Sequence, residues 1–286
     1  MDTVHDAPAL REILGRRRAA GPVILVPTMG ALHAGHLSLV RIARTRAGEA
    51  GTVVVSIFVN PIQFDRRDDL ESYPQPVAAD LDACRAAGVD VVFAPDAGTM
   101  YAPDRSVTVT ESALSSHLCG AARPGHFDGV CTVCLKLFLL TGCDAAVFGE
   151  KDFQQLAIIR RMTRDLDVPV EIIAAPTLRE PDGLAMSSRN IRLSPAQRAD
   201  APRIHRALCA AAALESPEDI LARARREIEA SPLARIDYLD LVDGDTLEPV
   251  GNPPRAGAAI LATAVFYGDV RLIDHVRVPA DNPVNS

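Results

Sequence analysis

The sequence lacks the features that indicate a membrane protein or a nucleic-acid-binding protein. No apolar run approaches the roughly 20 residues that a membrane-spanning helix needs. No basic segment leads into an apolar one near residue 1, so we expect no signal peptide and a cytoplasmic protein. The net charge is −7, which argues against nucleic-acid binding because that function needs a basic surface. An anionic small substrate is compatible with this charge, since the local field decides its binding.

The six cysteines form neither a disulfide framework nor a recognised zinc pattern. Cys131 and Cys134 make a C-x-x-C inside the apolar stretch 129–138, but the other cysteines and histidines supply no ligands at suitable spacing. We expect both thiols to be buried and to pack much as alanine does. A non-enzymatic metal-binding or redox module built on this pair is the alternative from another class of protein.

The first 177 residues alternate apolar, β-branched runs with amphipathic runs. This alternation predicts an α/β fold, in which a parallel sheet is covered by helices on both faces. We expect strands over 23–26, 52–59, 89–93, 106–110, 144–148 and 168–174, and helices over 4–18, 37–47, 78–87, 129–140 and from 153 onward.

After about Thr177 the pattern changes to that of a small α+β domain. Ser194 to Gln197 is a capping box with proline at the first helical position. An alanine-rich helix should follow to about Ala213, and a second helix should begin at Ser216. Strands are expected over 236–242 and 259–266, joined by a loop over 252–257. We therefore predict two domains, residues 1–177 and residues 178–286.

The segment from Val26 to His36 joins the first buried strand to an amphipathic helix. Gly30 and Gly35 suit a sharp bend and a close approach to a ligand, and a helix N-terminus favours a phosphate. His33 and His36 are three residues apart and share one face of the first helical turn. A single histidine is usually structural, but two here can stabilise charge on a phosphoryl group.

Three polar segments begin where predicted strands end, namely Pro27–His36, Asn60–Gln63 and Gly149–Gln155. The carboxyl ends of parallel strands share one edge, where such sheets bind ligands. We therefore expect the three segments to converge on one crevice. Lys151 supplies a compact positive charge there.

These segments resemble the signature sequences of the pantothenate synthetase family, also called pantoate–β-alanine ligases. The wider superfamily is that of the HxGH nucleotidyltransferases. The resemblance runs in order from Thr28 to Asp274 and rests on residues 27–36, 56–64, 123–127, 148–156 and 182–190.

The resemblance implies a Rossmann-like domain and a smaller C-terminal lid domain. It also implies an AMP-forming ligase that joins D-pantoate to β-alanine with ATP and Mg²⁺, through pantoyl adenylate and with release of pyrophosphate. A homodimer is implied as well. A nucleotidyltransferase that stops at the nucleotidyl product, such as a cytidylyltransferase, is the alternative enzyme.

The same resemblance assigns roles to individual residues. His33, His36, Lys151 and Arg189 would be catalytic, with His36 as the proton donor. Gln63 and Gln155 would hold pantoate, Gln63 also near β-alanine, and Asn60 and Arg123 would complete the substrate site. ATP would be bound by Met29, Gly30, Ala31, Leu32, His33, Ala34, Gly35, His36, Gly149, Glu150, Lys151, Asp152, Leu178, Met186, Ser187, Ser188 and Arg189.

One region departs from the family pattern. Gln75 stands where the family usually has arginine, and Ala79-Asp80 keeps only one acid of a usual pair. Asp80 is accordingly the sole candidate for a magnesium ligand in this region.

Overall fold

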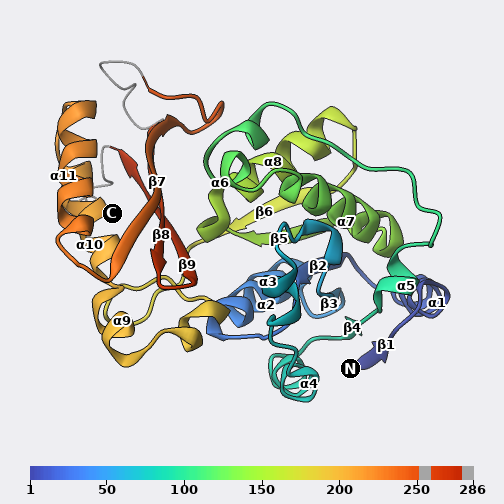
Figure 1. Cartoon of the computed structure of the whole chain (residues 1–286). Coiled ribbons are helices and arrows are strands. Elements are labelled where there is room, and N and C mark those ends of the chain that lie inside the picture. Colours follow the sequence, from blue (N-terminus) through green and yellow to red (C-terminus); the bar gives the residue numbers. More distant parts are fainter. Residues whose placement is uncertain (251–258, 279–286) are drawn as a thin grey trace. The chain divides into compact units, whose positions relative to one another are not determined.

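The computed structural model describes residues 1–250 and 259–278, which form two compact units. The first unit consists of Met1–Ser112, Arg123–Glu150 and Gln155–Pro176, and the second of Ala113–Ala122, Lys151–Gln154 and Thr177–Ser286. The predicted loop over 252–257 lies outside the described residues. Figure 1 shows the course of the chain.

The first unit is built on a parallel sheet of six strands in the order β1-β4-β3-β2-β5-β6. Chain order runs outward from β2 through β3 and β4, then returns to the other side of β2 with β5 and β6. The strands are almost wholly apolar because both faces are covered. They are β1 (Asp2–Val4), β2 (Val23–Thr28), β3 (Thr52–Ile57), β4 (Val91–Phe93), β5 (Ala145–Gly149) and β6 (Glu171–Ala175).

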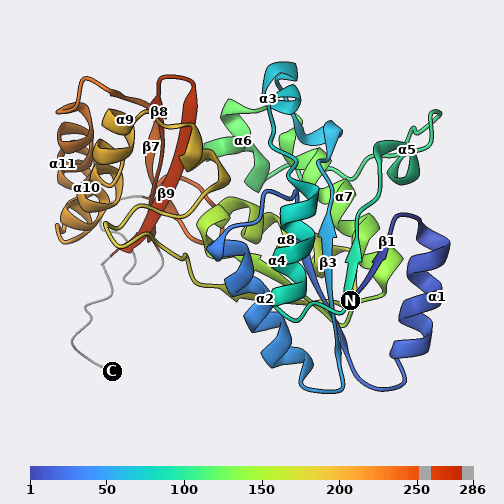
Figure 2. The same cartoon turned by 90° about the horizontal axis from the view of Figure 1, so that it is seen from below.

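Helices cover both faces of this sheet (Figure 2). On one face, α2 and α4 bury Val40, Ala43 and Cys84 against alternate residues of β2 to β5. On the other face, Phe138 of α7 meets Phe148 of β5 edge-on, with ring centroids 6.3 Å apart. The helical segments that begin in this unit are α1 (Ala7–Arg17), α2 (Ala34–Ala47), η1 (Pro61–Gln63), α3 (Arg67–Glu71), α4 (Val77–Ala86), α5 (Ala97–Met100), α7 (His126–Thr141) and η3 (Glu150–Asp152).

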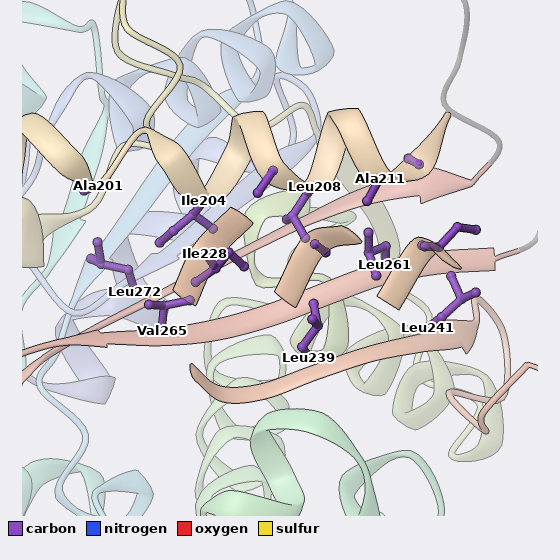
Figure 3. Packing of buried hydrophobic residues seen from close by; sticks show 14 of the residues in the cluster. Ala201, Ile204, Leu208, Ala211, Ile228, Leu239, Leu241, Leu261, Val265 and Leu272 are labelled. Carbon is purple, nitrogen blue, oxygen red and sulfur yellow. The ribbon is translucent and has the colours of Figure 1, made fainter. Parts of the chain in front are cut away.

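The second unit has an antiparallel sheet in the order β7-β8-β9, and helices α10 and α11 pack on one of its faces. Ile204 and Leu208 of α10, with Ile228 of α11, pack on Leu261 and Val265 of β8 (Figure 3). Its segments are η2 (Leu114–Ser116), α6 (Leu118–Ala122), η4 (Ser188–Arg192), α9 (Pro195–Asp200), α10 (Arg203–Ala212), α11 (Pro217–Glu229), β7 (Ala234–Asp243), β8 (Ala259–Tyr267) and β9 (Val270–Val278). Helix α8 (Phe153–Asp165) has its first two residues in this unit and the others in the first unit.

The α/β class is confirmed, and three local predictions need correction. The first helix begins at Ala7, capped by Asp6, because Val4 belongs to strand β1. No strand forms over 106–110. The alanine-rich helix is divided in two at Pro202, which has no N–H to continue it. Strand β9 was not predicted. The proposed domain limits, 1–177 and 178–286, stay a prediction.

Candidate nucleotide and substrate site

The three polar segments follow neighbouring strands of the first unit. Residues 29–33 follow β2, Asn60–Gln63 follow β3, and Glu150 follows β5, and these three strands are adjacent and parallel. The order of the sheet reverses between β2 and β5, which is where open parallel sheets bind ligands. The carboxyl edge of β3-β2-β5 is therefore the candidate site of the first unit.

The turn after β2 has an unusual backbone. Gly30 and Ala31 are both left-handed, with φ of 79° and 51°. Thr28 fixes the entry, because its hydroxyl donates to the Ser56 carbonyl at 2.7 Å and accepts from Gly30 N–H at 3.1 Å. Asp80 of α4 fixes the exit, accepting from Ala31 N–H at 2.8 Å and Leu32 N–H at 2.7 Å.

His33 and His36 form a reciprocal cap at the start of α2. His33 Nδ1 accepts from Gly35 N–H at 3.1 Å, and His36 Nδ1 accepts from His33 N–H at 3.3 Å. These bonds assign the proton of each neutral ring to Nε2. The N–H of each imidazole is therefore on Nε2, on the side of the ring away from the cap. Ala34 and Gly35 form the first turn of α2 between them.

Asn60 and Gln63 form a buried polar network at the end of β3. Asn60 Nδ2 donates to Gln63 Oε1 at 2.8 Å and to the Gly129 carbonyl at 3.1 Å, and Tyr101 donates its hydroxyl proton to Asn60 Oδ1 at 2.8 Å. Gln63 Nε2 in turn donates to Met29 Sδ at 3.2 Å. The network sets which end of the Gln63 amide faces the turn after β2.

Arg123 and His126 hold the main chain of the same segment. Arg123 pairs with Asp65 at 2.7 Å, and His126 Nδ1 lies 2.7 Å from the Gln63 carbonyl oxygen. Burial alone raises the pKa of Asp65, but the hydrogen bond and charge of Arg123 outweigh it and lower that pKa overall. Arg123 thus contacts protein groups next to Gln63. Gln155, in the first turn of α8, is half-buried.

The remaining candidate residues belong to the second unit. Lys151 lies 3.7 Å from Asp152 across an ion pair. Met186 N–H donates to the Leu178 carbonyl at 3.0 Å, so these two residues lie side by side across a narrow loop. Ser187 caps η4 by accepting from Arg189 N–H at 3.2 Å, with Ser188 as the first residue of η4.

A buried ion pair holds the base of that loop. Both guanidinium ends of Arg179 donate to Asp274, at 2.7 and 2.9 Å, and Asp274 is buried on β9. Arg179 also pairs through its backbone with Ala185, one residue before Met186. The two ends of the loop are therefore held rigidly. Such a rigid base suits a loop whose hydroxyl and guanidinium groups bind a ligand.

Three further residues contribute to the site although none was assigned an individual role from the sequence. Tyr101, Gly129 and Ser56 act through hydrogen bonds to residues 28 to 69 positions away. Such partners become visible only when the sheet brings the segments together. Ser56 and His126 did lie in segments that carry the family resemblance, residues 56–64 and 123–127.

The described residues do not form a cage for a metal ion. In the part of the chain that the structure describes, no group of three or more His, Cys, Asp or Glu side chains could hold one. Both oxygens of Asp80 accept backbone hydrogen bonds. Likewise, no described helix is long and apolar enough to cross a membrane.

A parallel sheet with a glycine-containing turn and a histidine-capped helix at the carboxyl edge defines a Rossmann-like nucleotide-binding protein. A sequence model described as "Pantoate-beta-alanine ligase" matches residues 2–277. The chain belongs to this family.

Named relatives agree over nearly the whole chain. The pantothenate synthetase of Akkermansia muciniphila is 51% identical, covering 97% of this chain and all of its own. That of Trichlorobacter lovleyi is 49% identical over 99% of this chain and all of its own.

Solved structures give the same result. The crystal structure of pantothenate synthetase from Thermus thermophilus has a TM-score of 0.90 at 43% identity, covering 96% of this chain and 99% of that one. The pantoate-beta-alanine ligase of Francisella tularensis, complexed with beta-gamma ATP and beta-alanine, has a TM-score of 0.81 at 30% identity, covering 97% of each chain.

Proposed function

We propose that this chain joins D-pantoate to β-alanine at the expense of ATP, in the biosynthesis of pantothenate. A pantoate carboxylate oxygen attacks the α-phosphorus of ATP, and pyrophosphate leaves. The β-alanine nitrogen then attacks the acyl carbon of pantoyl adenylate and loses a proton, and AMP leaves. The observation that carries the proposal is the family match over residues 2–277, together with the paired histidines at the carboxyl end of β2.

The proposed catalytic role of His33 and His36 is to donate hydrogen bonds to oxygens of the α-phosphate. Their Nδ1 atoms accept backbone hydrogen bonds, so the protonated Nε2 is the donor. Phosphoryl transfer depends mainly on positioning and charge stabilisation, which such donors supply. The proton-donor role that the resemblance gives His36 is proposed here as hydrogen-bond donation from Nε2–H, with the proton kept on the ring.

Gln63 and Gln155 are proposed to hold the hydroxyl and carboxylate groups of pantoate, because an amide both donates and accepts. Asn60 and Arg123 support them: Asn60 bonds Gln63 Oε1, and Arg123 pairs with Asp65 two residues beyond Gln63. Holding the acyl adenylate beside the amine can lower the barrier by about 7–11 kcal/mol.

The nucleotide is proposed to contact the turn after β2, the end of β5 and the 178–189 loop. Lys151, Ser187, Ser188 and Arg189 would neutralise its phosphates. The remaining ATP contacts are Met29, Gly30, Ala31, Leu32, Ala34, Gly35, Gly149, Glu150, Asp152, Leu178 and Met186. Residues 178–286 would form a lid domain that shields the reactive anhydride from water.

Mg²⁺ is proposed to enter with ATP. It commonly keeps several waters and binds through substrate phosphates and one or two carboxylates, where it neutralises phosphate charge. Asp80 is the candidate carboxylate from the sequence, but its arrangement does not fit that role well, since backbone N–H groups engage both of its oxygens. We also propose that the protein is a homodimer and that it is cytoplasmic.

The test is pantoate-dependent exchange of labelled pyrophosphate into ATP. Exchange without β-alanine, and AMP with pantothenate when β-alanine is added, are the expected results. A cytidylyltransferase-type enzyme would instead accumulate a nucleotidyl product whether or not β-alanine is present. Absence of exchange in a protein that still binds ATP would overturn the proposal.

A further inference from the structure

The turn between β2 and α2 has a backbone that needs an external support. Gly30 and Ala31 are consecutive left-handed residues, and alanine rarely adopts a φ of 51°. Such conformations persist only where the surroundings hold them. His33 follows two residues later as the N-cap of α2. The geometry of this turn therefore determines the positions of His33 and His36 at the start of α2.

The Asp80 carboxylate lies directly against this turn. Its side chain is buried, with the residue 2% exposed. Oδ2 accepts from Ala31 N–H at 2.8 Å, and Oδ1 accepts from Leu32 N–H at 2.7 Å. Successive N–H groups that converge in this way form a concavity that binds an anion. Here the anion is a side chain of the same protein, since Asp80 lies 49 residues after Ala31 and 48 residues after Leu32.

The fit between the carboxylate and the turn leaves no spare room. A Cβ added to Gly30 would lie 2.9 Å from Asp80 Oδ2 and 3.1 Å from Ile57 Cγ2. The absence of a side chain at residue 30 thus serves two needs, the left-handed φ and the close approach of Asp80. The hydrogen bonds also compensate the burial of a charged group.

We propose that Asp80 is a positioning residue, which fixes the main chain of residues 30–32 so that His33 and His36 face the α-phosphate. This role replaces that of a magnesium ligand. It rests on the proposed function for its catalytic consequence, but the effect of Asp80 on the turn exists without any substrate. Within the described residues, no cluster of potential metal ligands includes Asp80.

The experiment compares Asp80→Asn with Asp82→Asn. Asp82 lies on the same helix but is exposed and paired with Arg85, at 2.6 Å. Asparagine at residue 80 removes the charge and opposes one backbone N–H with another donor. Pantoate-dependent ATP–pyrophosphate exchange is measured at Mg²⁺ concentrations from limiting to saturating. We expect Asp80→Asn to lower the maximal exchange rate by about 10- to 100-fold with an unchanged half-saturating Mg²⁺ concentration.

A second measurement needs neither substrate nor metal. The imidazole ¹H–¹⁵N signals of His33 and His36 are recorded in metal-free, ligand-free protein. We expect these signals to shift in Asp80→Asn and to stay unchanged in Asp82→Asn. Gly30→Ala, which displaces the carboxylate without removing it, should shift the same signals and stands in for Asp80→Asn if that variant does not fold.

Two results would overturn the inference. One is an increased half-saturating Mg²⁺ concentration in Asp80→Asn, with the exchange rate restored by excess Mg²⁺. The other is unchanged histidine signals in every folded variant of residues 30 and 80. If the unmodified protein showed no exchange, the proposed function would fail, while the histidine signals would still test the effect of Asp80.

Discussion

The imidazole rings of His33 and His36 lie with their centroids 4.1 Å apart and their planes inclined by 41°. Each ring accepts a backbone N–H of the same helical turn through Nδ1. The pair is thus a capping box in which histidines take the places usually held by serine or threonine and glutamate. The cap uses Nδ1 of each ring, whereas the proposed catalytic hydrogen bonds come from Nε2. A substitution that keeps the cap but lacks the Nε2–H donor can therefore separate capping from catalysis.

His36→Ala should leave the protein folded and reduce pantoate-dependent exchange by about 100- to 1,000-fold. Removal of a donor that stabilises a developing oxyanion typically costs about 2.7–4 kcal/mol. His36→Gln is the matched variant, because glutamine at this helical position can keep the reciprocal cap. It should retain the unmodified protein's thermal stability and still lose exchange. A loss of less than a few-fold in both variants would show that His36 has another role.

Asn60→Asp should raise the KM for pantoate more than the KM for ATP. The substitution replaces the donor that contacts Gln63 Oε1 and the Gly129 carbonyl with an acceptor. An unmade buried hydrogen bond costs about 1–3 kcal/mol, so we expect a rise of roughly 5- to 100-fold in steady-state assays.

Tyr101→Phe is the control for that network. It removes one hydroxyl that donates to Asn60 Oδ1 but leaves the contact between Asn60 and Gln63 in place. We expect a smaller rise in the KM for pantoate than Asn60→Asp gives. Equal rises in the KM values for pantoate and ATP in Asn60→Asp would mean that Asn60 does not act through Gln63.

The sequence predicted most of the sheet because buried parallel strands are continuous apolar runs. Strands β2 and β3 show this directly, since all but one of their residues are buried. The short edge strand β1 has only Val4 buried, so its three residues carried no such signal. Burial alternates along the first part of strand β9, where Val270, Leu272 and Asp274 are buried. This period of two would have indicated a strand.

The candidate site was predictable where its parts are local. The turn after β2 combines glycine, histidine spacing and a helix start within ten residues. Asp80 could not be assigned its contacts in the same way, because one carboxylate on a helix has no distinctive pattern. Its contact with Ala31 depends on the packing of α4 beside β2 and β3. The resemblance to a family identified the residue, but its hydrogen bonds come from the fold.

Thiol titration should distinguish Cys131 and Cys134 from the surface cysteine. Burial raises the pKa of Cys131 to about 12, with smaller contributions from Glu111 and Asp128, and burial also raises the pKa of Cys134. Only a thiolate reacts rapidly. In native protein at pH 8, an excess of an aromatic disulfide reagent should label exposed Cys209 first.

The C-x-x-C pair should react only on unfolding, and elemental analysis should find no stoichiometric zinc. Cys209→Ser is the control and should remove the fast phase of labelling. Rapid reaction of Cys131 and Cys134 in the folded protein, or one zinc per chain, would favour the metal or redox module instead.

The stability of the second unit should decrease as the pH falls from about 7.5 to 4. Burial lowers the pKa of His275 from 6.5 to about 4, with the Asp274 charge opposing the shift and the Arg179 and Arg277 charges adding to it. Between these two pKa values the unfolded chain binds a proton that the folded chain does not, so stability rises with pH in this window. His275 alone should lower the free energy of unfolding by about 2 kcal/mol between pH 7.5 and 5.

His275→Gln tests this, because glutamine cannot take up a proton. Urea unfolding of both proteins is followed by circular dichroism at pH 7.5 and pH 5. The unmodified protein should lose more stability than the variant, and the difference between the two losses isolates His275 from the other titrating groups. Equal losses in the two proteins would show that His275 titrates at the same pH in the folded and unfolded chains.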